Sequence, residues 1–316
     1  MLERFLLLWL LLSSGVAYYW DESFATMKLL LPSLITVTMF SIGLMLPRDE
    51  VRQVFERWPA VFGGTAIQYA VMPLLAFSMG KAFGLTGDAF IGIVVVGCVP
   101  GAMASNVLTL NARGNTSYSV SLTTAATLLS PVAVPLVLAL ALQSKDGVDG
   151  AVLWNASKTL VLTVVVPVLV GHLLRCRFPI LEKPSHKYGS VVANLAILWI
   201  IAIVVAISKP QLEQLQFDLF GALLAVNFLG YLAGYVGGLG MKLPEPMRRA
   251  LTLEVGMQNA GLGAALAVKL FPSEAGVAIA PAIYTFGCML TGTILARVWA
   301  IASEIAIERK THVMKD

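Results

Sequence analysis

One acidic residue lies in the middle of a long apolar stretch, where a membrane-spanning helix would hold it far from water. This residue is Glu254, in "LTLEVGMQNAGLG" (251–263), and Gln258 follows it at helical spacing. A carboxylate at the bilayer centre costs at least ~2.5 kcal/mol, so it must be neutralised, paired or hydrated. No Lys or Arg lies at comparable depth in a predicted span, which leaves a bound metal cation or a proton.

Other oxygen donors accompany this carboxylate. If the helix unwinds at Gly256, the carbonyl groups of Val255 and Met257 become free acceptors. Such backbone must find partners within the protein or line a cavity. Carboxylate, amide and carbonyl oxygens together suit a hard cation such as sodium. Further polar side chains at similar depth in other spans are Gln68, Ser105, Asn106, Ser119 and Thr123.

The composition of the whole chain indicates a membrane protein. Of its 316 residues, 58% are hydrophobic and only 13% are charged, and the mean hydropathy is +0.81. Soluble domains have about 25% charged residues. The three cysteines are far apart and have no metal-ligand spacing, so we expect neither a disulfide framework nor a zinc site. The expected surroundings are a lipid bilayer, and neither nucleic acid nor an obligate protein partner is indicated.

Apolar stretches long enough to cross a bilayer recur along the sequence. Crossing ~30 Å of hydrocarbon takes about 20 helical residues. We interpret the first stretch as a transmembrane helix, although its flanks also suit a signal peptide. The ten predicted spans are 3–20, 26–46, 58–80, 88–111, 116–142, 151–174, 188–208, 216–240, 247–270 and 276–300.

The basic residues are distributed unequally between the two sides that these spans define. Sixteen of the 22 Lys and Arg residues fall on the side that also holds both termini. The other six are Lys28, Lys81, Lys145, Lys158, Lys209 and Lys269. Because the loops are short, the positive-inside rule applies. We therefore expect a multi-pass protein of the cell (inner) membrane with both termini in the cytoplasm.

Two spans are interrupted by glycine, proline and polar residues. The fourth contains "VVVGCVPGAMASNVLTL" and the ninth contains Glu254, so each is the fourth span of a five-span half. An odd number of spans per half inverts the second copy, and breaks at corresponding positions indicate a binding site. We expect inverted repeats at about 1–142 and 151–303, joined by "QSKDGVDG", with the broken helices crossing at mid-membrane. The N-termini of half-helices would attract an anion.

Three motifs resemble the bile acid:sodium symporter family, and the similarity runs over nearly the whole chain. They are "IQYAVMP" (67–73), "GCVPGAMASNVLTLNARGNTSYSVSLTT" (97–124) and "LTLEVGMQNAGLGAALA" (251–267). The resemblance implies a bacterial ten-helix member of the family. Helices 1, 2, 6 and 7 would form a panel domain, and helices 3, 4, 5, 8, 9 and 10 a core domain. Transport would be a rigid-body movement between the two domains.

The resemblance also implies two sodium sites that share Glu254. The first would add the side chains of Ser105, Asn106, Ser119 and Thr123. The second would add the side chains of Gln68 and Gln258 and the carbonyl groups of Val255 and Met257. Sodium is then the coupling ion, and a small organic anion is the transported substrate.

The substrate-facing positions implied by the resemblance are less typical than the sodium positions. They are Met103, Ala104, Asn259, Cys288 and Met289. Many bacterial relatives have Gly-Gly-Thr where this chain has Gly101-Ala102-Met103, and often a His-Asn pair that aligns with Cys288 and Met289. Both changes make the crevice less polar. Sodium coupling is thus better supported than bile acid as the substrate, and pantoate, pyruvate or another organic anion stays open.

Three other functional classes compete with this one. A receptor or channel that transports nothing stays open, although inverted repeats with broken helices favour alternating access. A proton-coupled carrier would use Glu254 alone, since burial favours a neutral carboxyl group. The amide and hydroxyl groups around it would then have no purpose. An intramembrane enzyme would need a second buried carboxylate, histidine ligands or a base near a serine, and the spans supply none of these. We therefore expect a transporter and no enzyme.

Overall fold

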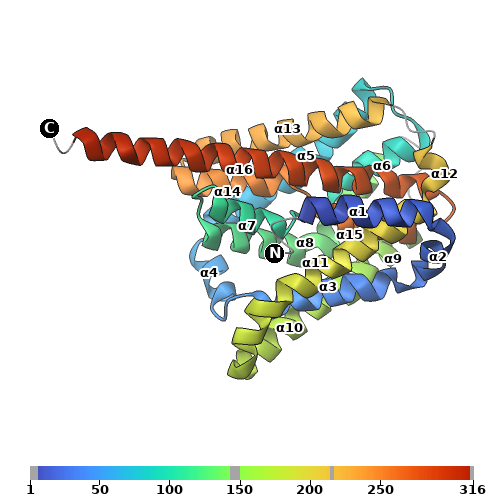
Figure 1. The fold of residues 1–316 in the computed structure, drawn as a ribbon, viewed down its shortest axis with the longest axis horizontal. Coiled ribbons are helices and arrows are strands. Elements are labelled where there is room, and N and C mark those ends of the chain that lie inside the picture. Colours follow the sequence, from blue (N-terminus) through green and yellow to red (C-terminus); the bar gives the residue numbers. More distant parts are fainter. Residues whose placement is uncertain (1–5, 143–149, 214–216, 314–316) are drawn as a thin grey trace.

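The computed structural model describes residues 6–142, 150–213 and 217–313. Within these ranges the chain is helical, and one isolated antiparallel β-bridge joins Gly101 to Gln258 (Figure 1). Nearly all of the predicted join "QSKDGVDG" lies outside the described residues, as does the start of the first predicted span. The described part thus agrees with the all-α class.

Seven of the described helical segments are long and apolar enough to cross a membrane. They are Asp21–Met45, Trp58–Ala82, Thr116–Ala141, Trp154–Arg177, Tyr188–Ile207, Phe217–Gly240 and Ala275–Ile305. Three further apolar helices are shorter, at Leu8–Tyr19, Gly87–Cys98 and Ala260–Leu270. Two of these three belong to the spans that we expect to be broken. Ten membrane crossings and the inverted repeat stay predictions.

The main helices follow the predicted spans in chain order. They are α1 (Leu6–Tyr19), α3 (Leu31–Met45), α5 (Trp58–Ala82), α6 (Gly87–Cys98), α7 (Ala104–Asn111), α8 (Thr116–Leu142), α9 (Gly150–Leu160), α10 (Val166–Arg177), α11 (Glu182–Ile207), α13 (Phe217–Gly240), α14 (Glu245–Gly256), α15 (Ala260–Leu270) and α16 (Ile279–Val313). The short helices are α2 (Asp21–Ala25), α4 (Glu50–Glu56) and α12 (Lys209–Leu212). A π-helical turn, η3 (Val161–Val165), joins α9 to α10.

The two interruptions have identifiable local causes. Between α6 and α7, Val99 is extended (φ −76°, ψ 156°), as expected for a residue that precedes proline. Between α14 and α15, Met257 is extended (φ −112°, ψ 105°). Asn259 then caps α15, because its side-chain oxygen accepts a 3.2 Å hydrogen bond from the Leu262 amide. The fourth and ninth predicted spans therefore each consist of two half-helices separated by extended backbone.

One group of helices packs around α3. It lies against both α10 and α11, and α11 also packs against α1 (Figure 1). Glycines bring α3 and α10 into backbone contact, because a Cβ on Gly43 would overlap the Val168 carbonyl and one on Gly171 would overlap the Phe40 carbonyl. Such close approach is typical of membrane helices with small residues at their interface.

A buried arginine reinforces this group. Arg175, only 4% exposed, donates from one guanidinium nitrogen to the carbonyl oxygens of Met45 at 2.6 Å and Leu46 at 2.5 Å. It also forms an ion pair with Glu182, at 3.8 Å, where α11 begins. The guanidinium satisfies carbonyls that the end of α3 leaves without helical partners. The ends of α3, α10 and α11 are thus tied together.

The remaining long helices pack around α5 and α13. α13 lies between α5 and α14, while α6 and α8 pack on α5. α16 lies along α13 and runs on past its neighbours toward the C-terminus (Figure 1). The two groups of helices meet where α8 contacts α9 and where α11 contacts α15. The broken helices belong to this second group, with α15 at its boundary with the first.

The glycine contact between α3 and α10 gives a testable prediction. Gly43→Ala should lower the free energy of unfolding by about 1–3 kcal/mol, because the helices must separate to admit a methyl group. Thermal unfolding in detergent measures the effect. Gly15→Ala is the matched control, since a Cβ there meets nothing within 4 Å. Equal melting temperatures for the two variants would contradict the packing role of Gly43.

Candidate functional site

The two helix breaks lie against one another and exchange backbone hydrogen bonds. The Ala102 amide donates to the Met257 carbonyl at 2.7 Å, and the Asn259 amide donates to the Pro100 carbonyl at 2.8 Å. These bonds flank the bridge between Gly101 and Gln258. Backbone groups in a membrane protein need partners within the protein. Each break therefore supplies the partners that the other has lost.

Glu254 lies directly behind this crossing and is 1% exposed. Its Oε2 accepts hydrogen bonds from Ser105 at 2.6 Å and Thr123 at 2.7 Å. Its Oε1 is buried, and none of the described residues donates a hydrogen bond to it. Among the described residues, no ion pair includes Glu254. A buried carboxylate oxygen without a donor is costly, so this atom is suited to bind a cation.

Asn106 and Ser119 lie on either side of Thr123. The Thr123 hydroxyl is 3.5 Å from the Asn106 side-chain oxygen and 3.1 Å from the Ser119 carbonyl. The Ser119 hydroxyl itself is 3.2 Å from the Thr109 hydroxyl, a partner that the sequence analysis did not identify. The structure therefore brings Ser105, Asn106 and Thr123 together around Glu254, with the hydroxyl of Ser119 turned toward Thr109.

The two glutamines form a second polar group at the crossing. The Gln68 amide nitrogen donates to the Gln258 side-chain oxygen at 3.0 Å, and the Gln258 amide nitrogen donates to the Val255 carbonyl at 2.9 Å. Both glutamines are buried, at 2% and 1% exposed. The Met257 carbonyl is engaged by the Ala102 amide. Three predicted ligands of the second site, on Gln68, Gln258 and Val255, are thus hydrogen-bonded to one another, and the Met257 carbonyl is bonded to Ala102.

Two functional candidates were missed by the sequence analysis. The Gly256 carbonyl accepts hydrogen bonds from the Asn227 side chain at 2.8 Å and from the Tyr284 hydroxyl at 2.7 Å. Asn227 comes from α13 and Tyr284 from α16, and both are 1% exposed. Asn227 could have been found from the sequence, because it is an amide residue in the middle of the apolar span 216–240. Nothing in the sequence marked Tyr284.

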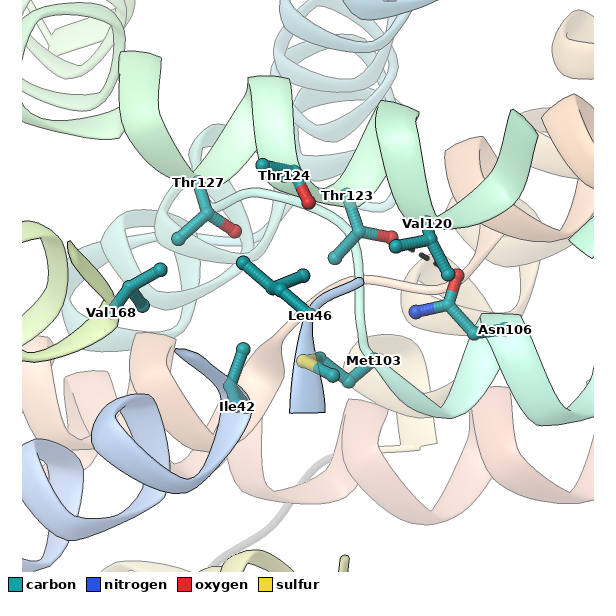
Figure 2. A pocket seen from close by; sticks show the side chains of 9 residues that line it. All are labelled: Ile42, Leu46, Met103, Asn106, Val120, Thr123, Thr124, Thr127 and Val168. Atoms are coloured by element: carbon teal, nitrogen blue, oxygen red, sulfur yellow. Dashed lines mark hydrogen bonds between the residues drawn. The ribbon is translucent and has the colours of Figure 1, made fainter. Parts of the chain in front are cut away.

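A small hollow lies beside the Glu254 cluster (Figure 2). Its polar wall carries hydroxyl groups from α8 and the Asn106 amide from α7, and its apolar wall comes mainly from α3 and α10. The lining residues are Ile42, Leu46, Met103, Asn106, Val120, Thr123, Thr124, Thr127 and Val168. The volume is ≈ 10 Å³, enough for about one water molecule. The hollow lies between the two groups of helices.

The predicted substrate-facing residues are distributed more widely than expected. Met103 lines the hollow, whereas Asn259 caps α15 and Ala104 begins α7. Cys288 is 2% exposed, and its Sγ donates to the Thr285 carbonyl at 3.5 Å. Neither Cys288 nor the half-buried Met289 is among the lining residues of the hollow. Of the five positions, the structure thus brings only Met103 to the hollow.

Paired helix breaks around a buried carboxylate, in a chain of apolar helices, define a class of protein: such sites are typical of secondary transporters. The comparison with known families agrees, because residues 32–215 match the family described as "Sodium Bile acid symporter family". The chain belongs to this family. It is therefore an integral membrane transporter and not an enzyme.

Individual relatives cover most of the chain. It is 31% identical over 297 residues to "Uncharacterized sodium-dependent transporter YocS" of Bacillus subtilis, covering 93% of this chain and 90% of that protein. It is 33% identical over 271 residues to "Probable sodium/metabolite cotransporter BASS1, chloroplastic" of Arabidopsis thaliana, covering 84% of this chain and 65% of that protein. It is 25% identical over 253 residues to "Hepatic sodium/bile acid cotransporter" of Rattus norvegicus, covering 78% and 69% respectively.

Proposed function

We propose that the protein is a sodium-coupled symporter of a small organic anion. The observation that carries this proposal is the buried Glu254 carboxylate, whose Oε1 has no donor among the described residues although hydroxyl groups bind its Oε2. A monovalent cation would neutralise this charge, and the surrounding oxygens are the donors that a hard cation prefers. The names of the relatives, which describe sodium-dependent transporters and cotransporters, add independent support.

Two sodium sites are proposed, both with Glu254 as a ligand. The first uses the side chains of Ser105, Asn106, Ser119 and Thr123. For Ser119 to take part, its hydroxyl must turn away from Thr109. The second uses Gln68, Gln258 and the carbonyl groups of Val255 and Met257, and sodium there would replace the bond from Gln258 to the Val255 carbonyl.

The substrate is proposed to bind at the front of the crossing, near Met103, Ala104 and Asn259. The half-helices α7 and α15 begin there, and the N-terminus of a helix attracts anions. The hollow beside it has neutral hydroxyl and amide donors on one wall and apolar side chains on the other. An organic anion with an apolar body suits both walls, and sodium would balance its charge. Cys288 and Met289 lie on α16, so they would contact the substrate only if the crossing opens toward that helix.

Alternating access is proposed to occur between the two groups of helices. The panel would comprise α1, α3, α9, α10 and α11, and the core would comprise the other long helices. The Arg175 contacts and the glycine contact of α3 with α10 support a panel that moves as one body. The hollow has room for only about one water molecule, so an organic anion could enter only after the two groups separate. We also propose an inner-membrane location with cytoplasmic termini.

Proton coupling at Glu254 is the alternative. Uptake measured in sodium-free buffer over a range of pH distinguishes the two mechanisms. Under the sodium proposal, replacing sodium by choline abolishes uptake at every pH. Undiminished uptake without sodium that rises as the pH falls would favour proton coupling.

Thermal unfolding of the purified protein tests the function directly. Organic anions are screened with and without sodium, because a ligand that binds the native state raises the melting temperature. We expect sodium alone to stabilise the protein, and the true substrate to add stabilisation only when sodium is present. An anion that stabilises equally in choline would contradict coupling.

Gln258→Ala should weaken sodium binding without abolishing it. The variant removes one of the proposed ligands, so the sodium concentration for half-maximal uptake should rise about tenfold. Sodium titration of uptake measures this change. Gln53→Ala, in α4 and away from the crossing, is the control. Identical titrations for the Gln258 variant and the unmodified protein would exclude Gln258 as a ligand.

A further inference from the structure

The carbonyl groups at the end of α14 accept hydrogen bonds from different donors. Some of these donors belong to a network of side chains behind the crossing. The Leu253 carbonyl accepts from the Met257 amide at 3.0 Å, as a helix end requires. The Val255 and Met257 carbonyls accept from groups at the crossing. Gly256, which lies between them in sequence, has its carbonyl bound by Asn227 and Tyr284 instead.

The geometry of the break makes these orientations depend on one another. Met257 is extended (φ −112°, ψ 105°), and successive peptide groups of extended backbone face opposite ways. The Gly256 carbonyl therefore points toward α13 and α16, while the Met257 carbonyl points toward the other break. The peptide that joins the two residues carries the Gly256 carbonyl and the Met257 amide, so turning it changes the backbone angles of both Gly256 and Met257. Whatever holds the Gly256 carbonyl therefore also holds the backbone from which the Val255 and Met257 carbonyls extend.

The donors behind Gly256 are themselves fixed in orientation. The Thr291 hydroxyl donates to the Asn227 side-chain oxygen at 2.7 Å, so the amide nitrogen of Asn227 must face Gly256. The Tyr231 hydroxyl lies 3.1 Å from that of Thr291 and completes the network. A Cβ on Gly256 would overlap the Tyr231 ring, so only glycine allows the backbone to approach these groups. Buried networks with every member bonded are rigid.

We propose that Asn227 and Tyr284 are positioning residues that set the sodium affinity of the second site by holding the Gly256 carbonyl away from it. Without them, this buried carbonyl lacks partners, and the peptide turns to find others. The carbonyl groups of Val255 and Met257 then lose the direction that a cation requires. The proposal rests on the proposed function, because it assigns a role to these residues only if sodium binds at the crossing.

Tyr284→Phe tests the proposal, because it removes one hydroxyl and keeps the ring. Asn227→Leu is a second variant, which removes the amide at similar volume. Purified proteins are unfolded thermally while sodium is titrated against choline at constant ionic strength. We expect each variant to raise the half-maximal sodium concentration about threefold to tenfold, the effect of losing one hydrogen bond.

Tyr231→Phe is the matched control. It also removes a buried hydroxyl of the same network, but that hydroxyl contacts Thr291 and the Cys288 carbonyl and makes no hydrogen bond to Gly256. We expect it to lower the melting temperature without sodium and to leave the half-maximal sodium concentration unchanged. A merely structural role predicts the same behaviour for both tyrosine variants.

The outcomes separate this inference from the function on which it rests. If the unmodified protein binds sodium and Tyr284→Phe binds it equally well, or if both tyrosine variants lose affinity equally, the positioning role is overturned. If sodium does not stabilise the unmodified protein at any concentration, the proposed function fails and the inference fails with it. A loss of affinity confined to the Tyr284 and Asn227 variants supports the inference.

Discussion

Glu254→Ala should abolish sodium-dependent uptake while leaving the protein inserted in the membrane. The carboxylate is the one negative charge among the proposed ligands, and both sodium sites use it. Its Oε2 holds Ser105 and Thr123, so these two hydroxyl groups also lose their common partner. We expect uptake in sodium to fall to the level measured in choline. Transport assays in membrane vesicles, with insertion checked by immunoblotting, measure the result.

Glu254→Gln separates charge from shape. It keeps the size of the side chain and an oxygen for the two hydroxyl groups, yet it removes the negative charge that a cation would neutralise. We expect it to be as inactive as the alanine variant, and also to have lost stabilisation by sodium. Glu56→Ala is the control, because that side chain is 56% exposed and pairs only with Arg52 among the described residues. Sodium-dependent uptake by Glu254→Gln would refute the assignment of Glu254 as a sodium ligand.

Gly101→Ala should impair transport nearly as severely, although the substitution adds a single methyl group. A Cβ at Gly101 would overlap Oε1 of Glu254, the atom proposed to bind sodium. Gly101 is also paired with Gln258 in the bridge between the breaks, so its backbone cannot move aside without separating them. The carboxylate must therefore turn away from the site. We expect half-maximal sodium concentrations to rise by about 100-fold or more, as for the loss of a charged ligand.

Gly261→Ala is the matched control for Gly101→Ala, because it adds the same methyl group near the crossing without a clash. Gly261 lies in α15 just beyond the ninth-span break, and the nearest atom to its Cβ would be 3.7 Å away on Ile197. Alanine is the better helix former, so this variant should be as stable as the unmodified protein or slightly more stable. Normal sodium titration by Gly101→Ala, measured alongside Gly261→Ala, would show that Oε1 of Glu254 does not bind the ion.

The positions of the helix breaks could be predicted from sequence because their causes are local. Pro100 prevents helix at Val99, and the glycines and amides near 256–259 are poor continuations of an apolar helix. The isolated carboxylate was conspicuous for the same reason, since its burial is expensive wherever it lies in a membrane. The absence of Lys or Arg at comparable depth in the predicted spans indicated that a cation and further oxygen donors would lie near it.

The partners of individual atoms could not be predicted in this way. The bond from Gln258 to the Val255 carbonyl and the contact of Ser119 with Thr109 depend on side-chain rotamers at a tertiary contact. Tyr284 was missed because a tyrosine in an apolar span more often packs than donates to a distant carbonyl. The orientation of Cys288 depends on the rotation of α16 about its axis, and the sequence of α16 has no amphipathic period that would predict this rotation.

The pairing of the two breaks also limits how the chain can be divided. The Ala102 amide and the Pro100 carbonyl find their partners only in residues more than 150 positions later. A polypeptide ending after α8 would hold the α6–α7 break in lipid with those groups unbonded. Such a fragment would need a second chain to supply the missing hydrogen-bond partners. Each half of the chain therefore completes the hydrogen bonding of the break in the other half, and we expect neither half to fold stably in a membrane alone.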